Sequence, residues 1–311
     1  MNTNPNTQST SHLLMIRPVN FGFNEETASS NAFQKRNAAS DRIKQQARQE
    51  FDTMVNMLCA NGVDVTVIED TPEPYTPDSI FPNNWVSFHE DGNVFLYPMR
   101  AENRRLERRE DIIMGLEDRF TVKHVIDLSR FEHDGKFLEG TGSMVLDREN
   151  KIAYACISPR TDLDVLALFC EQTGYKEVSF KAFDEYHQAI YHTNVLMCIG
   201  SRFAVVCLDS ITDEDEKNAV VLILKLTHKE IITISFDQMN SFAGNMLEVK
   251  NKAGENLIVM SKSAFEALDQ SQKNSLEKYG KLVYSDIHTI ENNGGGSVRC
   301  MMAEVHLPVG S

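Results

Sequence analysis

The stretch NVLMCIGSRFAVV, residues 194–206, joins a small polar residue to two short apolar runs separated by a Gly-Ser turn. Related arrangements occur five times along the chain. The residues that open them are Asn84, Gly142, Asn194, Asn245 and Cys300, at separations of 58, 52, 51 and 55 residues. A regular spacing of tens of residues indicates a repeat architecture. Equivalent positions of such repeats converge around a pseudo-symmetry axis, so we expect residues that are distant in sequence to share one site.

Each copy combines strands with a helical stretch. First strands are expected over residues 85–88, 143–146, 195–199, 246–249 and 301–305. Spacing and end signals predict helices over residues 29–60, 101–116, 162–173, 212–225 and 261–279. Further strands are expected over residues 64–68, 123–127, 176–180, 230–235 and 281–285. A crossover helix is the usual link between parallel strands. The sequence therefore predicts an α/β fold of five strand–strand–helix–strand units in one closed domain.

Domain limits and cellular setting follow from composition. Residues 1–12 are rich in Ser, Thr and Asn and are expected to form a disordered lead without a signal-peptide pattern, so the single domain is placed at residues 13–311. The net charge of −14 disfavours nucleic acid and anionic membranes as partners. No run approaches the roughly 20 apolar residues that span a bilayer. The six cysteines contain no Cys-x-x-Cys pair, which favours a reduced, cytoplasmic protein.

Cys300 is the candidate nucleophile. It follows the glycine run of residues 294–296, and glycine lets the backbone pass close to a ligand and adopt positive φ. The neighbouring Arg299 is able to favour a thiolate. A lone cysteine is more often a buried structural residue, but the glycine run and the repeat position favour a catalytic role. Whether Arg299 acts on the thiol or packs against the loop stays open.

Two further residues have a chemical context. His192 precedes Asn194 at an expected strand start, and its equivalence to the Cys300 position makes it an acid/base candidate rather than an ordinary hydrogen-bonded histidine. Glu139 lies between apolar and glycine residues, which is unusual for a solvated surface carboxylate. The alternative for Glu139 is a turn residue that caps backbone donors. Asp78 is a weaker candidate, because Pro-Asp-Ser is common turn chemistry.

No cofactor is expected. The sequence has no His-x-x-x-His pair, no calcium-type carboxylate loop and no thiolate quartet, so it predicts no metal site. It also lacks the glycine patterns that bind nucleotides after a strand.

These motifs, in this order, resemble the guanidino-group modifying superfamily of arginine deiminases, dimethylarginine hydrolases and amidinotransferases. The resemblance covers about residues 16–308 and implies a five-fold pseudo-symmetric α/β propeller. The stretches that carry it are residues 77–84, 139–142, 157–161, 192–194, 244–248 and 294–300.

The resemblance also implies roles. Cys300 would attack the substrate carbon, His192 would transfer protons, and Glu139 would orient both histidine and substrate. Arg160 would bind the substrate α-carboxylate, and Arg104, three residues before a glutamate, is a second candidate for that role. The implied partner is a small amino-acid substrate, and the superfamily makes a homodimer an additional expectation.

Two departures from the superfamily pattern bear on the substrate. Asn84 and Asn194 stand where deiminases carry aspartates that hold the cationic guanidinium. A buried carboxylate without a cation is costly, whereas Asn both donates and accepts. The sequence thus predicts a neutral ureido substrate, as in the citrulline-utilisation hydrolases of the superfamily. Arginine deiminase and methylarginine hydrolase activity remain alternatives, as does a non-catalytic binding protein, since fold alone establishes no chemistry. The order of product release stays open.

Overall fold

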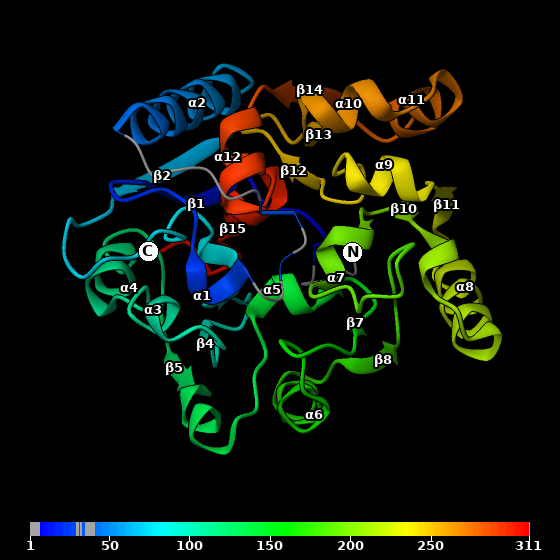
Figure 1. Cartoon of the computed structure of the whole chain (residues 1–311), viewed down its shortest axis with the longest axis horizontal. Helices are drawn as coiled ribbons and strands as arrows, with labels where there is room; N and C mark the ends of the chain where they lie inside the picture. Colours follow the sequence, from blue (N-terminus) through cyan, green and yellow to red (C-terminus); the bar gives the residue numbers. More distant parts are fainter. Residues whose placement is uncertain (1–6, 29–30, 32, 35–40, 311) are drawn as a thin grey trace.

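A computed structural model describes residues 7–28, 31, 33–34 and 41–310 of the chain. The fold is mixed α/β with five sheets of three strands each (Figure 1). The first two sheets along the chain are β3 (Val86–Phe88), β4 (Asn93–Leu96), β5 (His124–Asp127), and β6 (Val145–Asp147), β7 (Ile152–Cys156), β8 (Lys176–Phe180). The next two are β9 (Met197–Ile199), β10 (Phe203–Val206), β11 (Glu230–Thr233), and β12 (Leu247–Lys250), β13 (Asn256–Ser261), β14 (Lys281–Ser285).

The fifth sheet joins the two ends of the chain. It consists of β15 (Ala303–Glu304), β1 (His12–Arg17) and β2 (Asp64–Glu69). In every sheet the middle strand pairs antiparallel with the first strand and parallel with the third. The expected strand–strand–helix–strand order is therefore confirmed, with the fifth unit divided between the termini. The pairing of Leu13 with Glu304 holds the segment after Cys300 beside the N-terminal strand.

Helices connect the middle and third strands and lie on the outside of the molecule (Figure 1). They are α2 (Asp41–Ala60), α3 (Glu102–Arg105) with α4 (Glu110–Leu116), α6 (Leu163–Thr173), α8 (Glu214–Leu226), and α10 (Lys262–Ala267) with α11 (Gln270–Glu277). The helices expected over residues 101–116 and 261–279 are thus each divided in two. A new helix, α11, begins after Asp269, because the side chains of Asp269 and Gln272 each accept a hydrogen bond from the other residue's backbone N–H. The expected helix over residues 29–60 is present as α2 over Asp41–Ala60, and the described residues 31, 33 and 34 are not helical. Residues 29–30, 32 and 35–40 lie outside the described residues.

Helix α2 shows why these connections pack as they do. Its buried residues Ala47, Phe51, Met54 and Leu58 recur at helical spacing and form one apolar face. That face joins the apolar cluster that contains Leu13 and Met15 of β1 and Val283 of β14. None of the described helices is long and apolar enough to cross a membrane.

The sequence predicted that the strands begin directly after the residues that open each repeat. In the structure four of these residues lie in single helical turns before the strands, and Asn245 follows a turn. Asn84 ends the 3-10 turn η1 (Pro82–Asn84), Gly142 lies in α5 (Gly140–Ser143), and Asn194 lies in α7 (Thr193–Leu196). Asn245 follows α9 (Phe236–Asn240), and Cys300 lies in η4 (Val298–Met301). The turns α5 and α7 lie near the centre of the molecule in Figure 1. The turn before each strand places the residue that opens the repeat near the centre of the molecule.

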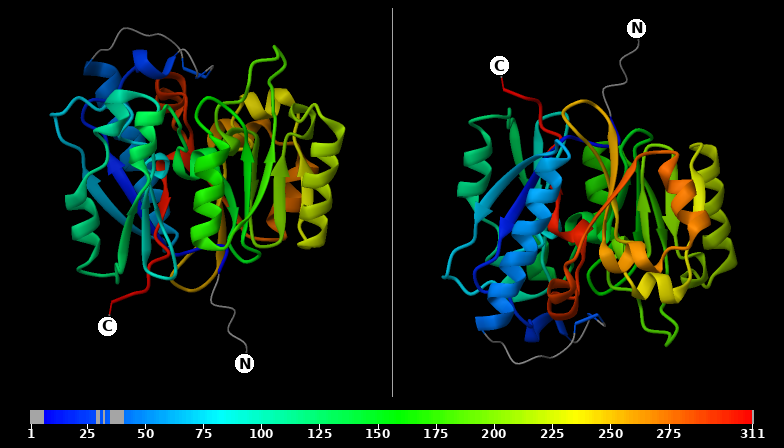
Figure 2. Two further views of the ribbon diagram at one scale, coloured as in Figure 1. Left: turned by 90° about the horizontal axis from the view of Figure 1, so that it is seen from below. Right: turned by 90° about the horizontal axis from the view of Figure 1, so that it is seen from above.

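Residues 7–12, part of the expected N-terminal lead, lie in the described structure and pack against the fold. Residues 1–6 lie outside the described residues, but Gln8 and Ser9 are buried. Gln8 donates to the carbonyls of Leu146 and Ile199 and accepts from the backbone N–H of Arg148. These bonds satisfy buried backbone groups, which is why the segment is ordered. The C-terminus lies on the face opposite the short helix α1 (Glu25–Ala28) (Figure 2).

Candidate active site

The single turns that open the repeats pack against one another. The Asn84 turn (η1) contacts both the Cys300 turn (η4) and α5, and α5 contacts α7. Their side chains are almost fully buried, with Asn84 3% exposed, Asn194 1%, Asn245 1% and Cys300 5%. The prediction that equivalent repeat positions converge is therefore confirmed for these turns.

Two asparagines approach the sulfur of Cys300. The amide nitrogens of Asn194 and Asn245 each lie 3.4 Å from Cys300 Sγ. Asn194 and Asn245 both open a repeat, yet only Asn194 was identified from the sequence as a site residue. Equivalence with Cys300 in the repeat was the signal that pointed to Asn245.

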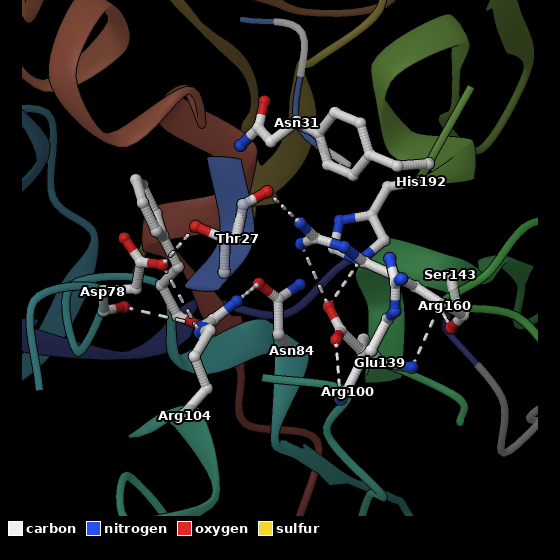
Figure 3. A network of polar contacts seen from close by, with 12 residues as sticks. Thr27, Asn31, Asp78, Asn84, Arg100, Arg104, Glu139, Ser143, Arg160 and His192 are labelled. Carbon is white, nitrogen blue, oxygen red and sulfur yellow. Dashed lines mark hydrogen bonds and ion pairs between the residues drawn. The ribbon is translucent and has the colours of Figure 1, made fainter. Parts of the chain in front are cut away.

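Glu139 and His192 form a buried pair (Figure 3). Glu139 Oε2 lies 2.8 Å from His192 Nε2 and 3.4 Å from Nη1 of Arg160. Glu139 Oε1 accepts from the backbone N–H of Arg100 at 3.1 Å. Ser143 Oγ accepts from the Glu139 N–H and donates to the Arg160 carbonyl, which ties the turn of Glu139 to Arg160.

The surroundings of this pair lower the pKa values of both Glu139 and His192. Burial alone raises the pKa of Glu139, but the Arg160 guanidinium and the His192 hydrogen bond outweigh it and hold that pKa well below its usual range. Burial lowers the pKa of His192 to about 4, although Glu139 opposes the shift. At neutral pH the glutamate is ionised and the imidazole is neutral. The imidazole therefore donates through Nε2 to Glu139 and leaves Nδ1 as an acceptor.

Arg104 orients the side-chain amide of Asn84. Nη1 of Arg104 donates to Asn84 Oδ1 at 2.8 Å, and its Nε and Nη2 each donate to the Glu107 carboxylate at 2.9 Å. Arg104 is 2% exposed and binds Glu107 as a bidentate pair. Its donors face Glu107 and Asn84, and its expected role as a clamp for the substrate carboxylate stays a prediction. Asn84 Nδ2 is buried without a hydrogen-bond partner among the described residues.

Glycine at position 142 creates the space between Asn84 and His192. A Cβ on Gly142 would lie 2.3 Å from Asn84 Nδ2 and 2.8 Å from His192 Nδ1. These distances are too short for real contacts, so a larger residue would displace one group or the other. The same distances place the free amide nitrogen of Asn84 and the acceptor nitrogen of His192 around one point.

A segment near the N-terminus covers this site. Asn24 Nδ2 donates to Asp78 Oδ2 at 2.7 Å. The Thr27 carbonyl accepts from Nη2 of Arg160 at 3.3 Å (Figure 3). Burial raises the pKa of Asp78, partly offset by Arg104. Asp78 Oδ1 and Asn194 Oδ1 are buried without hydrogen-bond partners among the described residues. The sequence offered no signal for Asn24 or Thr27, because their positions depend on how residues 21–28 fold over distant turns.

The glycine run of residues 294–296 also packs closely against neighbouring side chains. A Cβ on Gly294 or Gly296 would lie 2.8 Å from the ring of Phe81, so the run fits tightly against a side chain. Gly295 has φ of +65° and ends α12 (His288–Gly294). Its carbonyl accepts from the Tyr191 hydroxyl at 2.7 Å. The run thereby places Cys300 beside the turns of Phe81 and Tyr191. Within the described residues, no cluster of three or more His, Cys, Asp or Glu side chains is arranged to hold a metal ion.

Comparison with protein families gives a match over nearly the whole chain. The family described as "N,N dimethylarginine dimethylhydrolase, eukaryotic" matches residues 17–307. No curated protein is significantly similar to the chain.

Solved structures share the fold at low sequence identity. The N-terminal domain of ArgZ, an arginine dihydrolase from the ornithine–ammonia cycle in Cyanobacteria, is 19% identical with a TM-score of 0.74, over 96% of this chain and 98% of that domain. That structure is a cysteine-to-serine mutant bound to its substrate. The chain spans 41% of full-length ArgZ, with a TM-score of 0.73 and 19% identity over 96% of this chain. DDAH from Pseudomonas aeruginosa, a cysteine-to-serine mutant complexed with citrulline, is 14% identical with a TM-score of 0.66, over 95% of this chain and 99% of that one.

Proposed function

The chain belongs to the N,N-dimethylarginine dimethylhydrolase family of hydrolases that act on guanidino C–N bonds, and from this premise we propose that it hydrolyses the ureido group of citrulline. The products would be ornithine, ammonia and carbon dioxide. Cys300, His192 and Glu139 would carry the reaction. The proposal depends on how Asn84, Asn194 and Asp78 meet the substrate.

The bond from Arg104 to Asn84 Oδ1 carries the choice of substrate. Because Oδ1 is engaged, Asn84 offers the site a donor, its NH2 group. A ureido group has a carbonyl oxygen that accepts such a bond, whereas a guanidinium has only donors. Asn194 complements this arrangement, because its Oδ1 is free to accept from the ureido NH2.

The amino-acid end of citrulline would meet charged groups on the covered side of the site. Asp78 Oδ1 is free to accept from the α-ammonium group. Arg160 extends from Glu139 to the Thr27 carbonyl and is our candidate to bind the α-carboxylate, with charge-assisted hydrogen bonds. Arg104 would contribute by orienting Asn84.

The chemistry would proceed in two steps. The neutral His192 accepts the thiol proton of Cys300, and the sulfur bonds to the ureido carbon. The C–N bond to the ornithine side chain then breaks as the imidazolium, stabilised by Glu139, protonates the leaving nitrogen. Water activated by His192 hydrolyses the S-carbamoyl group to carbamate, which decomposes to ammonia and carbon dioxide. One water is consumed per citrulline.

A comparison of two substrates tests this proposal. Purified protein is incubated with citrulline and, in parallel, with arginine, and ornithine and ammonia are quantified. Turnover of citrulline with little turnover of arginine supports the role of Asn84. Release of ammonia from arginine without ornithine, together with no turnover of citrulline, would retain the family chemistry and reject the ureido assignment. Cys300→Ser is expected to lose activity by at least about 1,000-fold, and substantial residual activity would reject the covalent mechanism.

The proposal extends to architecture and setting. The five sheets would close into a five-fold propeller within a single domain, since β6 contacts β9, β9 contacts β12 and β15 contacts β3. All six cysteines are free thiols, in keeping with a reducing compartment such as the cytoplasm.

A further inference from the structure

Asn245 has no free polar atom to offer a substrate. Its Nδ2 donates to the Asn194 carbonyl at 2.8 Å and lies 3.4 Å from Cys300 Sγ. Its Oδ1 accepts from the backbone N–H of Arg299 at 3.0 Å. Asn194 differs, because its Oδ1 has no partner among the described residues. Asn245 therefore contacts the reacting sulfur without facing the substrate position.

The orientation of the Asn245 amide is determined by its partners. If the amide were reversed, its NH2 group would meet the Arg299 N–H and its oxygen would meet the Asn194 carbonyl. Both contacts would be repulsive, and both groups would lose a hydrogen bond in a buried site. The NH2 group must therefore point toward Cys300, although Sγ also lies 3.8 Å from Oδ1.

The side chain of Arg299 keeps this arrangement in place and points away from the sulfur. Nη2 of Arg299 lies 2.7 Å from Glu304 Oε2, and Nη1 donates to the Met302 carbonyl at 2.8 Å. The guanidinium charge is thus neutralised by Glu304. The contribution of Arg299 to the site is its backbone N–H, which is held in position for Asn245 by the paired side chain.

We propose that Asn245 is a catalytic residue that, together with Asn194, stabilises the Cys300 sulfur as a thiolate through two amide N–H donors. This inference rests on the proposed function only in taking Cys300 as the nucleophile. A buried anion needs hydrogen-bond donors to replace water, and donors to a charged group form the stronger bonds. Two neutral amides supply these bonds without adding a positive charge, so they do not create a second attraction for the substrate carboxylate. On this proposal Asn194 forms hydrogen bonds with both the sulfur and the substrate, whereas Asn245 forms a hydrogen bond with the sulfur and none with the substrate.

Alkylation of Cys300 measures this effect directly. The rate of modification by iodoacetamide is followed against pH by peptide mass spectrometry in the wild-type protein, Asn245→Asp and Asn245→Ser. In Asn245→Asp a carboxylate replaces the donor, so we expect about tenfold slower modification at pH 7. Asn245→Ser, which keeps a donor, is expected to fall between the two. The exposed Cys59 in the same molecules is the matched control, and its profile should not change.

Steady-state kinetics separates the two asparagines. Asn245→Ser is expected to lower kcat for citrulline while KM stays within about twofold, whereas Asn194→Ser should change both. An unchanged alkylation profile of Cys300 in both Asn245 variants, with the fold retained by circular dichroism, would overturn the inference even if citrulline is turned over. If the Asn245 variants slow the alkylation of Cys300 but the wild-type protein does not hydrolyse citrulline, the role of Asn245 is retained and the substrate proposal is rejected instead.

Discussion

Nη1 of Arg104 donates to Asn84 Oδ1 at 2.8 Å, and this bond determines which face of the Asn84 amide meets the centre of the site. Both partners are buried, and Glu107 holds the guanidinium from its other side. Arg104, which lies behind Asn84, therefore decides whether the Asn84 amide offers a donor or an acceptor to the site. Selectivity should respond to changes in Arg104 as well as in Asn84.

Arg104→Lys should weaken the discrimination between citrulline and arginine. Lysine retains the charge beside Glu107 but lacks the planar donor fork that reaches both Glu107 and Asn84. Loss of one hydrogen bond to a charged group corresponds to about 2 kcal/mol, or about 30-fold in the ratio of kcat/KM values. The measurement is kcat/KM for both substrates. An unchanged ratio in a folded variant would show that the Asn84 amide is oriented by other contacts.

Asn84→Asp should shift the preference toward a cation. The aspartate would present an oxygen where the amide presents NH2, so the ureido carbonyl would be repelled and a guanidinium favoured. We expect the arginine-to-citrulline ratio of kcat/KM to rise by about 30-fold or more. Asn83→Asp is the matched control, because it adds the same charge one residue earlier, where the amide nitrogen contacts Thr141. If both variants shifted the ratio equally, a general charge effect would explain the result.

Gly142→Ala should abolish most activity while the protein still folds. The added methyl would lie 2.3 Å from the Asn84 amide nitrogen and 2.8 Å from His192 Nδ1, so these groups must move apart. Displacement by about 1 Å at a reacting centre costs on the order of 100-fold in kcat. Gly115→Ala is the control: no described atom lies within 4 Å of its Cβ, and alanine in helix α4 is expected to stabilise the protein by about 0.5–1 kcal/mol. Normal kcat in Gly142→Ala would contradict the proposed geometry.

His306→Gln should reduce the sensitivity of the protein to acid. Burial and Arg148 lower the pKa of His306 to about 4, although Glu304 opposes the shift. Between the ordinary histidine value near pH 6.5 and pH 4, the unfolded chain binds a proton that the folded chain does not. The free energy of unfolding therefore decreases as pH falls through this window, by on the order of 3 kcal/mol for this residue.

Chemical denaturation at pH 7 and at pH 4.5 checks this expectation. The loss of unfolding free energy between the two pH values should be smaller in His306→Gln than in the wild-type protein. His192 contributes in the same direction, because its pKa is also lowered to about 4 by burial. The variant should therefore retain part of the pH dependence. An identical loss of unfolding free energy in both proteins would show that folding does not lower the pKa of His306.

Local sequence determined the order of the elements and indicated which residues to expect at the candidate site. The spacing of apolar residues and the cap residues predicted five units, and α6 and β8 lie almost where they were expected. The recurrence of Asn84, Asn194 and Cys300 at equivalent positions indicated that they meet. These properties depend on neighbouring residues, because helix caps, strand runs and turns are specified within a few positions along the chain.

Tertiary structure decided how these residues act. Pairing of β1 with β15 completes the fifth sheet from both ends of the chain, which no local pattern specifies. The direction of the Asn84 amide depends on Arg104, and that of Asn245 on the backbone of Arg299. Hydrogen-bond direction at an amide is set by partners that approach from distant segments. The sequence therefore pointed to Asn84 and Asn194, while only the fold decided in which direction each side-chain amide points.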